Sequence, residues 1–315
     1  MTYKIVHIAD THIKLIKQQK EYKKIFEKMY EIIKQEKPTQ IVHCGDLFHS
    51  KTDLSPEAVH MAMDFLKSLA DIAPTYIIPG NHDLNLSNPK RLDAITPIVE
   101  ALQHPNLFYL KNSQEVHIDE DFCFNVLSIV DEDNWRPISN PDKINIALFH
   151  GSLSGVVTDT GYVMEYGDHP IEIFEGFDYA LLGDIHKTFQ KLDQEGRIAY
   201  PGSTVQQNHG ETNDKGFLVW EIEDKNTFKC KHIAIQNPTP FVTIELEPDG
   251  QLPENIYIPT NARIRLVSNT HLSVQSLKKA VDIAKTRFSP ESIQVHNRPG
   301  KRISVDEISN TVEED

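Results

Sequence analysis

Apolar runs of strand length alternate with segments of helical periodicity through the first 110 residues of the chain. The strand-like runs are "YKIVHIA" (3–9), "TQIVHCG" (39–45), "TYIIPG" (75–80) and "NLFYL" (106–110). Between them, the pattern predicts helices over 21–37, 55–71 and 89–103. This order predicts a largely parallel sheet with helices on its faces.

The following segment is richer in strands. Apolar runs lie at 122–130, 144–150, 177–183, 187–193, 197–202, 216–223 and 228–235. We therefore predict an α/β fold in which two sheets pack face to face, in the manner of a β-sandwich, with helices outside. The long polar segments 131–143 and 151–170 are expected to be loops that border a site.

A second domain is predicted after the two prolines of "QNPTPF" (236–241), which interrupt the pattern. Beyond them come strand-like runs and one amphipathic helix, at 241–246, 262–268, 273–288 and 292–295. We expect a large domain over 1–240, a small α+β domain over 241–300, and a mobile acidic tail over 301–315.

Composition narrows the class of protein. The formal net charge of −14 argues against a protein that coats nucleic acid with a broad basic face. It leaves open an enzyme that holds nucleic acid locally, through metal ions and a few lysines. The three cysteines lie far apart without a CxxC spacing, so neither a disulfide framework nor a thiolate zinc site is expected. No apolar run approaches the length of a membrane span.

Five short motifs each begin where an apolar strand is predicted to end. They are "ADTH" (Asp10, His12), "CGDLFH" (Asp46, His49), "PGNHD" (Asn81, His82, Asp83), "LFHG" (His150) and "LGDIH" (Asp184, His186). Strand ends of a parallel α/β sheet converge on one crevice, so these side chains should meet. Carboxylate, imidazole and amide oxygen are ligands for divalent cations, and two such ions can clamp a phosphate. The ordered set therefore predicts a two-metal site, with the two oxygens of Asp46 best suited to bridge the ions.

This ordered set resembles the calcineurin-like metallophosphoesterase superfamily, whose motifs are D-x-H, G-D, G-N-H-D/E, H and G-H-x-H. Within it, "GDLFHS", "YPGSTVQQNHGETNDKG" (200–216) and the small C-terminal domain resemble SbcD-type nucleases. These are bacterial and phage relatives of the eukaryotic double-strand-break repair nuclease. The resemblance implies a metallophosphoesterase domain, followed by a small domain that caps the site and binds DNA.

The resemblance also implies roles for individual residues. One metal would be held by Asp10, His12, Asp46 and His186, and the second by Asp46, Asn81, His150 and Asp184. His82 would face the phosphate without a metal bond, and Asp83 would orient it. His49 would help to place the substrate, with a loop histidine beside the site as the alternative.

One position departs from the family pattern. "GDIH" stands where the superfamily has "GHxH", so Asp184 replaces an imidazole with a carboxylate. A third carboxylate adds a hard oxygen ligand in place of an imidazole nitrogen. We therefore expect two Mn²⁺ ions, with Mg²⁺ as the alternative, in preference to Zn²⁺.

The implied activity is that of a dinuclear-metal-dependent DNA nuclease, a 3′–5′ exonuclease and single-strand endonuclease of double-strand-break repair or recombination. Its expected partners are DNA ends and single strands, an SbcC-type SMC-like ABC ATPase, and a second copy of the chain bound through helices 55–71 and 89–103. The candidate DNA contacts are Lys14, Lys17, Arg298, Lys301 and Arg302, unless the first two belong to a solvated stretch. We expect a cytoplasmic protein near the nucleoid, or in the host cytoplasm if viral, without membrane association.

Other activities on the same fold stay open. Protein phosphatases of the superfamily carry an arginine after the second motif, in a "GDxVDRG" pattern, and "GDLFHSKTD" counts against them. A phosphomonoesterase or cyclic-nucleotide phosphodiesterase is not excluded by motif, although the latter would not need the C-terminal domain. The chain lacks the amphipathic segment through which SbcD-type proteins bind the ATPase coiled coil, so either the sequence is truncated or the ATPase binds elsewhere. A full ligand set argues against a decayed, non-enzymatic scaffold.

Overall fold

The computed structural model describes residues 2–14, 16, 18–297 and 301–303. The chain divides into two compact units, which are Met1–Gln207 with Asp214–Ile235, and Asn208–Asn213 with Gln236–Asp315. The second unit thus begins near the two prolines that suggested a boundary, and it also includes the loop 208–213.

The first unit contains two six-stranded sheets. The first sheet has the order β12-β11-β1-β2-β3-β4, and its strands are β1 (Tyr3–Ile8), β2 (Gln40–Cys44), β3 (Thr75–Ile78), β4 (Leu107–Tyr109), β11 (Gly216–Ile222) and β12 (Phe228–Ala234). The strands β1 to β4 run parallel, whereas β11 pairs antiparallel with both β1 and β12. The carboxyl ends of β1, β2 and β3 therefore lie at one edge of this sheet.

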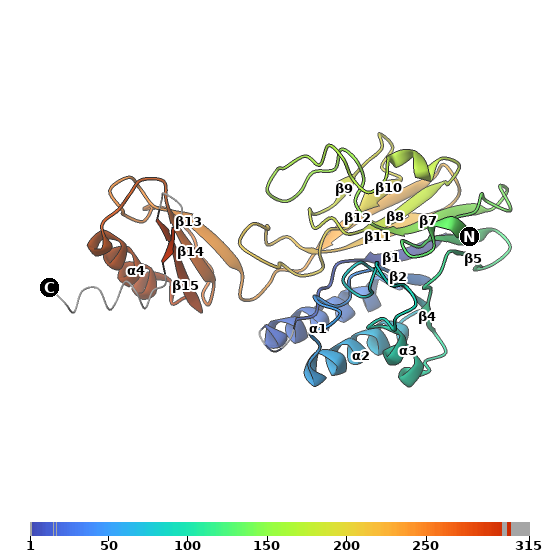
Figure 1. Cartoon of the computed structure of the whole chain (residues 1–315), viewed down its shortest axis with the longest axis horizontal. Helices are drawn as coiled ribbons and strands as arrows, with labels where there is room; N and C mark the ends of the chain where they lie inside the picture. Colours follow the sequence, from blue (N-terminus) through green and yellow to red (C-terminus); the bar gives the residue numbers. More distant parts are fainter. Residues whose placement is uncertain (1, 15, 17, 298–300, 304–315) are drawn as a thin grey trace. The chain divides into compact units, whose positions relative to one another are not determined.

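Three helices cover the outer face of the first sheet: α1 (Gln19–Glu36), α2 (Pro56–Ala70) and α3 (Thr96–Leu102) (Figure 1). The helix α2 begins as its sequence predicts, because the Ser55 hydroxyl accepts the Ala58 N–H at 3.2 Å and Pro56 follows. The prediction of a helix over 89–103 is wrong for residues 89–95. There the Asp93 carboxylate accepts the N–H groups of Ile95 and Thr96 and starts the helix later.

The second sheet has the order β5-β6-β7-β8-β10-β9. Its strands are β5 (Gln114–His117), β6 (Phe122–Leu127), β7 (Ile144–His150), β8 (Tyr179–Gly183), β9 (Gln190–Lys191) and β10 (Ile198–Tyr200). Short 3-10 turns, η1 (Glu132–Asn134) and η2 (Ile171–Phe174), interrupt its loops. Buried side chains from both sheets, such as Val42, Trp220, Phe124 and Leu148, form one core between them. The predicted α/β fold with two facing sheets is confirmed, although the strand expected over 187–193 shrinks to two residues.

In its described residues, the second unit consists of a four-stranded sheet and one helix. Its strands, in the order β13-β14-β15-β16, are β13 (Phe241–Glu245), β14 (Arg263–Ser268), β15 (Ser292–Asn297) and β16 (Lys301–Ile303). The helix α4 (Val274–Phe288) packs Leu277 and Val281 against Ile244 and Leu266 of the sheet. The first three residues of the expected tail thus form β16, and the rest of the tail, 304–315, lies outside the described residues. None of the helices in the described part of the chain has both the length and the apolar character needed to cross a bilayer.

Candidate metal centre

The five motifs meet where strands of both sheets end. Backbone hydrogen bonds join the loops that follow neighbouring strands: the Asp10 N–H donates to the Gly45 carbonyl, and the His12 N–H to the Asp46 carbonyl, both at 3.0 Å. In the second sheet, the Gly151 N–H donates to the Gly183 carbonyl at 3.1 Å. The loops therefore continue the pairing of the strands, which brings residues far apart in sequence into one site.

Four of the predicted ligands have left-handed backbone conformations. The φ angles are 51° at Asp10, 48° at His12, 58° at Asp46 and 105° at Asp184. Positive φ is uncommon in residues other than glycine, and it persists only where the surrounding structure imposes it. Here it turns the chain sharply at each strand end, next to the other ligands.

Two motif glycines are required by close approach. Gly45 has a φ of 85°, and a Cβ atom there would lie 2.3 Å from Nδ1 of His150. A Cβ atom on Gly80 would lie 2.1 Å from the Asp46 carboxylate. Both distances are far below contact distance, so only glycine lets these strand ends come together.

One cluster of ligand atoms is formed by Asp10, His12 and His186, all within 4.8 Å of one another. The Nε2 atoms of His12 and His186 face each other at 2.9 Å. The same His12 nitrogen lies 3.5 Å from Oδ2 of Asp46. Two imidazole nitrogens and carboxylate oxygens that converge in this way match the donors of a divalent cation.

A second cluster is formed by Asp10, Asp46 and His150. Nδ1 of His150 donates to the Cys44 carbonyl at 2.7 Å, which leaves Nε2 as the nitrogen able to ligate. That Nε2 atom makes no hydrogen bond within the described residues and lies 3.5 Å from Oδ1 of Asp46 and 3.8 Å from Oδ1 of Asp184. The buried Oδ1 of Asn81 is equally without a hydrogen-bond partner there. A cation would satisfy these orphaned atoms.

The carboxylate of Asp46 lies between the two clusters. Its Oδ2 faces His12 and its Oδ1 faces His150. The Oδ1 atom also accepts the backbone N–H of His82 at 2.9 Å. This is the arrangement that a bridging ligand requires, so the residues present fit a pair of metal ions.

The pKa shifts of the buried carboxylates are those expected of a site that binds cations. Burial raises the pKa of Asp10 to about 7, and the nearby Asp46 and Asp184 carboxylates contribute to the shift. Burial alone would raise the pKa of Asp46, but His150 and His12 hold it below its ordinary value. Without metal, the buried acids and imidazoles must stabilise one another's charges, whereas bound cations would supply the positive charge directly.

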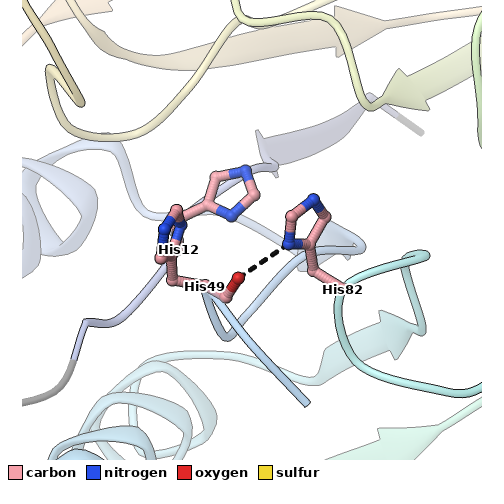
Figure 2. Close-up of side chains that lie close together, drawn as sticks. All are labelled: His12, His49 and His82. Atoms are coloured by element: carbon pink, nitrogen blue, oxygen red, sulfur yellow. Dashed lines mark hydrogen bonds between the residues drawn. The ribbon is translucent and has the colours of Figure 1, made fainter. Parts of the chain in front are cut away.

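The catalytic candidates His82 and His49 lie beside His12 (Figure 2). The His82 ring meets the His12 ring edge-on, with centroids 5.0 Å apart, and Nδ1 of His82 donates to the His49 carbonyl at 2.7 Å. Asp83 has another role than the expected one. Its carboxylate accepts the N–H groups of Leu47, Phe48 and Gly80, so it joins the second and third motifs instead of orienting the His82 ring.

Comparison with known families matches residues 3–188 to the calcineurin-like phosphoesterases. This match covers more than half of the chain. The chain belongs to the calcineurin-like phosphoesterase family. The family consists of metal-dependent hydrolases that use a dinuclear metal site, and the predicted resemblance is confirmed.

Relatives of this phosphoesterase include viral and archaeal proteins. An uncharacterized protein of Acanthamoeba polyphaga mimivirus, R555, is 36% identical over 93% of this chain and 22% of its own length. The DNA double-strand break repair protein Mre11 of Saccharolobus solfataricus is 28% identical over 63% of this chain and 54% of its own length. The corresponding protein of Methanocaldococcus jannaschii is also 28% identical, over 63% of this chain and 56% of its own length. This phosphoesterase thus spans about a fifth of R555 and little more than half of the two Mre11 proteins.

The structure describes only some of the residues predicted to contact DNA. Lys14 donates to the Gln207 carbonyl at 3.1 Å, while Lys17 and Arg298 lie outside the described residues. Lys301 and Arg302 belong to β16 of the other unit.

Sequence reasoning missed two lysines that contact the backbone of predicted ligands. Lys51 donates to the Asn81 carbonyl at 3.0 Å, and its position five residues after Asp46, in "GDLFHSK", was the only signal. Lys215 donates to the His186 carbonyl at 2.7 Å. It lies in the segment 200–216 that marked the nuclease branch, and this was its signal.

Proposed function

We propose that this phosphoesterase is a dinuclear-metal-dependent DNA nuclease, with 3′–5′ exonuclease and single-strand endonuclease activity, in double-strand-break repair or recombination. The observation that carries the proposal is the Asp46 carboxylate between two clusters of ligand atoms. Two-metal sites suit phosphodiester hydrolysis because they stabilise both the attacking and the leaving oxygen. The relatives named as break-repair proteins support DNA as the substrate.

In the proposed centre, Asp10, His12 and His186 would hold one cation, Asn81, His150 and Asp184 would hold the other, and Asp46 would contribute to both. The bound cations would clamp the phosphate and supply a hydroxide at neutral pH. The backbone N–H of Asp184 donates to both oxygens of Asp10, at 3.0 and 3.1 Å, and so orients that carboxylate. We propose Mn²⁺, with Mg²⁺ as the alternative, because Asp184 adds a hard oxygen ligand.

His82 is the proposed general acid. Because a carbonyl oxygen only accepts, Nδ1 must carry the proton in the hydrogen bond to His49. The proton that moves during the reaction is therefore the one at Nε2. When the ring is protonated on both nitrogens, Nε2 can give this proton to the leaving oxygen. His49 is proposed to place the substrate.

The proposed partners are DNA, an SMC-like ATPase of the SbcC type, and a second copy of the chain that packs against α2 and α3. Lys14 and the basic residues Lys17, Arg298, Lys301 and Arg302 are proposed backbone contacts. A cytoplasmic location near the nucleoid, or in the cytoplasm of a host, follows from this role.

The test compares substrates on one preparation loaded with Mn²⁺. Linear duplex labelled at either end, circular single-stranded DNA and p-nitrophenyl phosphate separate exonuclease, endonuclease and monoesterase activity. We expect release of nucleotides from 3′ ends and cleavage of the circle. Both should be lost in EDTA and in Asp46→Asn. Turnover of the monoester alone would overturn the nuclease proposal and favour a phosphomonoesterase.

A further inference from the structure

Residues 200–207 and 214–216 of the segment "YPGSTVQQNHGETNDKG" (200–216) belong to the first unit and supply none of the proposed ligands, yet Ser203 and Thr204 contact the loops that carry them. The Thr204 hydroxyl donates to the Ala9 carbonyl at 2.7 Å, and the Thr204 N–H to the Asp10 carbonyl at 3.3 Å. The Ser203 N–H donates to the His186 carbonyl at 3.2 Å. These bonds attach the segment to the backbone of two ligand loops.

Lys215 ends this segment and is almost fully buried, with 1% of its side chain exposed. Its ammonium donates to both carboxylate oxygens of Asp159 at 2.9 Å and to the His186 carbonyl at 2.7 Å. An ammonium has three protons and can therefore donate to all three of these acceptors. Lysine is rarely buried, and a buried ion pair is a poor source of stability because both charges lose their hydration. Because the pair contacts the backbone of His186, we consider a role for it other than stability.

The carbonyl of His186 accepts two donors, the Ser203 N–H at 3.2 Å and the Lys215 ammonium at 2.7 Å. Gly202 also approaches it closely, since a Cβ atom on Gly202 would lie 2.8 Å from the same oxygen. The ammonium is in turn held by Asp159 of the loop 151–170. Lys215 itself is anchored to the first sheet, since its carbonyl accepts the Ile235 N–H at 2.7 Å. The loop that carries one imidazole ligand is thus fixed to a rigid sheet.

We propose that Lys215 is a positioning residue of the metal centre. Its ammonium, held by Asp159, fixes the backbone of His186, so that the imidazole meets His12 in a geometry ready for a cation. Groups that orient ligands raise metal affinity because the site loses less freedom on binding. The effect should be larger for the cation held by His12 and His186, because the contact is to the His186 carbonyl itself, whereas Asp184, proposed for the other cation, lies two residues earlier in the same loop. The proposal rests on the metal centre of the proposed function and not on its preference for DNA.

The test measures Mn²⁺ binding by isothermal titration, without any substrate. The wild-type protein should bind two ions. Lys215→Met keeps the length of the side chain and removes its donors, and it should weaken the site of His12 and His186 about 10–100-fold and the other site much less. Lys111→Met is the matched control. It removes an ion pair of 2.8 Å with the buried Asp93, whose other hydrogen bonds in the described residues go to Ile95 and Thr96 and not to a proposed ligand, so it should lower the melting temperature without changing Mn²⁺ affinity.

The double variant Lys215→Met/Asp159→Asn separates positioning from folding, because Lys215→Met alone leaves the Asp159 charge buried without its ammonium. The double variant should recover melting temperature, yet one Mn²⁺ site should stay weak. Recovery of Mn²⁺ affinity together with melting temperature would overturn the proposal, as would equal weakening of both sites or of neither. If the wild-type protein binds fewer than two ions, the metal centre itself fails, and this proposal with it.

Discussion

Nδ1 of His82 donates to the backbone carbonyl of His49 at 2.7 Å, so the third motif is oriented by the main chain of the second. The same two motifs are joined again by the His82 N–H, which donates to Asp46, and by the Asp83 carboxylate, which accepts from the Leu47 and Phe48 N–H groups. The imidazole proposed to act on the leaving group is therefore fixed relative to the Asp46 carboxylate, the proposed bridge between the metal ions. Substitutions at this junction should separate catalysis from metal binding.

Substitution of His82 by alanine should abolish most of the chemistry and leave the metals bound. Loss of a general acid typically lowers kcat about 10²–10⁴-fold. Isothermal titration should still detect two Mn²⁺ ions, since no proposed ligand is lost. His117→Ala, an exposed histidine on the edge strand β5, is the control and should change neither quantity. Loss of both ions in the His82 variant would mean that this ring is a ligand.

The substitution His49→Ala removes the imidazole but keeps the carbonyl that orients His82. We therefore expect hydrolysis of the small diester bis-p-nitrophenyl phosphate to fall much less than in His82→Ala. Exonucleolytic degradation of linear duplex should fall further, because the His49 ring is proposed to place the polymer. Equal losses on the two substrates would count against a substrate-placing role.

Asp184 should set the metal preference. Asp184→Asn keeps the shape of the side chain and removes its charge, so Mn²⁺ binding at the site shared with His150 should weaken. Asp184→His restores the imidazole of the family pattern and should move preference from Mn²⁺ toward Zn²⁺. Activity and binding titrations with both metals measure the shift. If neither variant changes the preference, Asp184 is not a ligand.

Gly80 should tolerate no side chain. In Gly80→Ala the new methyl group would overlap the Asp46 carboxylate, 2.1 Å from the Cβ position, so metal affinity and activity should both collapse. Gly155→Ala is the control: its φ of 85° makes alanine cost about 1–2 kcal/mol, but nothing lies within 4 Å of the new atom. That variant should lose some stability and keep its metals. Full Mn²⁺ binding by Gly80→Ala would show that the Asp46 carboxylate can move aside.

The Asp93–Lys111 pair should make stability depend on pH in acid. Burial acts to raise the pKa of Asp93, but the Lys111 and Thr96 hydrogen bonds hold it below its ordinary value. The stabilisation is therefore present above the unfolded pKa of about 3.9 and is lost as pH falls through the folded value. Asp93→Asn should cost about 1.5–3 kcal/mol at pH 7.

Urea unfolding from pH 7 down to pH 2 measures this dependence, and the curves of the variant and the wild-type protein should converge in acid. Lys111→Met removes the same pair from the other side and should converge likewise. Curves that stay parallel over the whole range would contradict the assignment of the pair.

Much of the fold was predictable because its signals are local. The strand "YKIVHIA" and the helix with Ile25 and Met29 on one face follow from hydrophobic period alone. The segment 89–95 was misjudged because its helix-like pattern competes with one carboxylate, that of Asp93, which binds two N–H groups and delays the helix. The expected role of Asp83 failed for a similar reason. The family resemblance implied that Asp83 orients His82, but the carboxylate binds a loop 35 residues away in sequence.

The sequence by itself determined which residue types stand at the ends of the strands, and parallel strand order then required them to converge. It also determined that Asp184 departs from the family pattern. Only the tertiary structure decided which oxygen of Asp46 faces which cluster, which main-chain carbonyl orients His82, and how Lys215 reaches His186. These contacts depend on the registration of two separate sheets and on backbone groups that have no residue-specific signal. Every residue has a backbone carbonyl, so the sequence does not indicate which carbonyl will accept a given hydrogen bond.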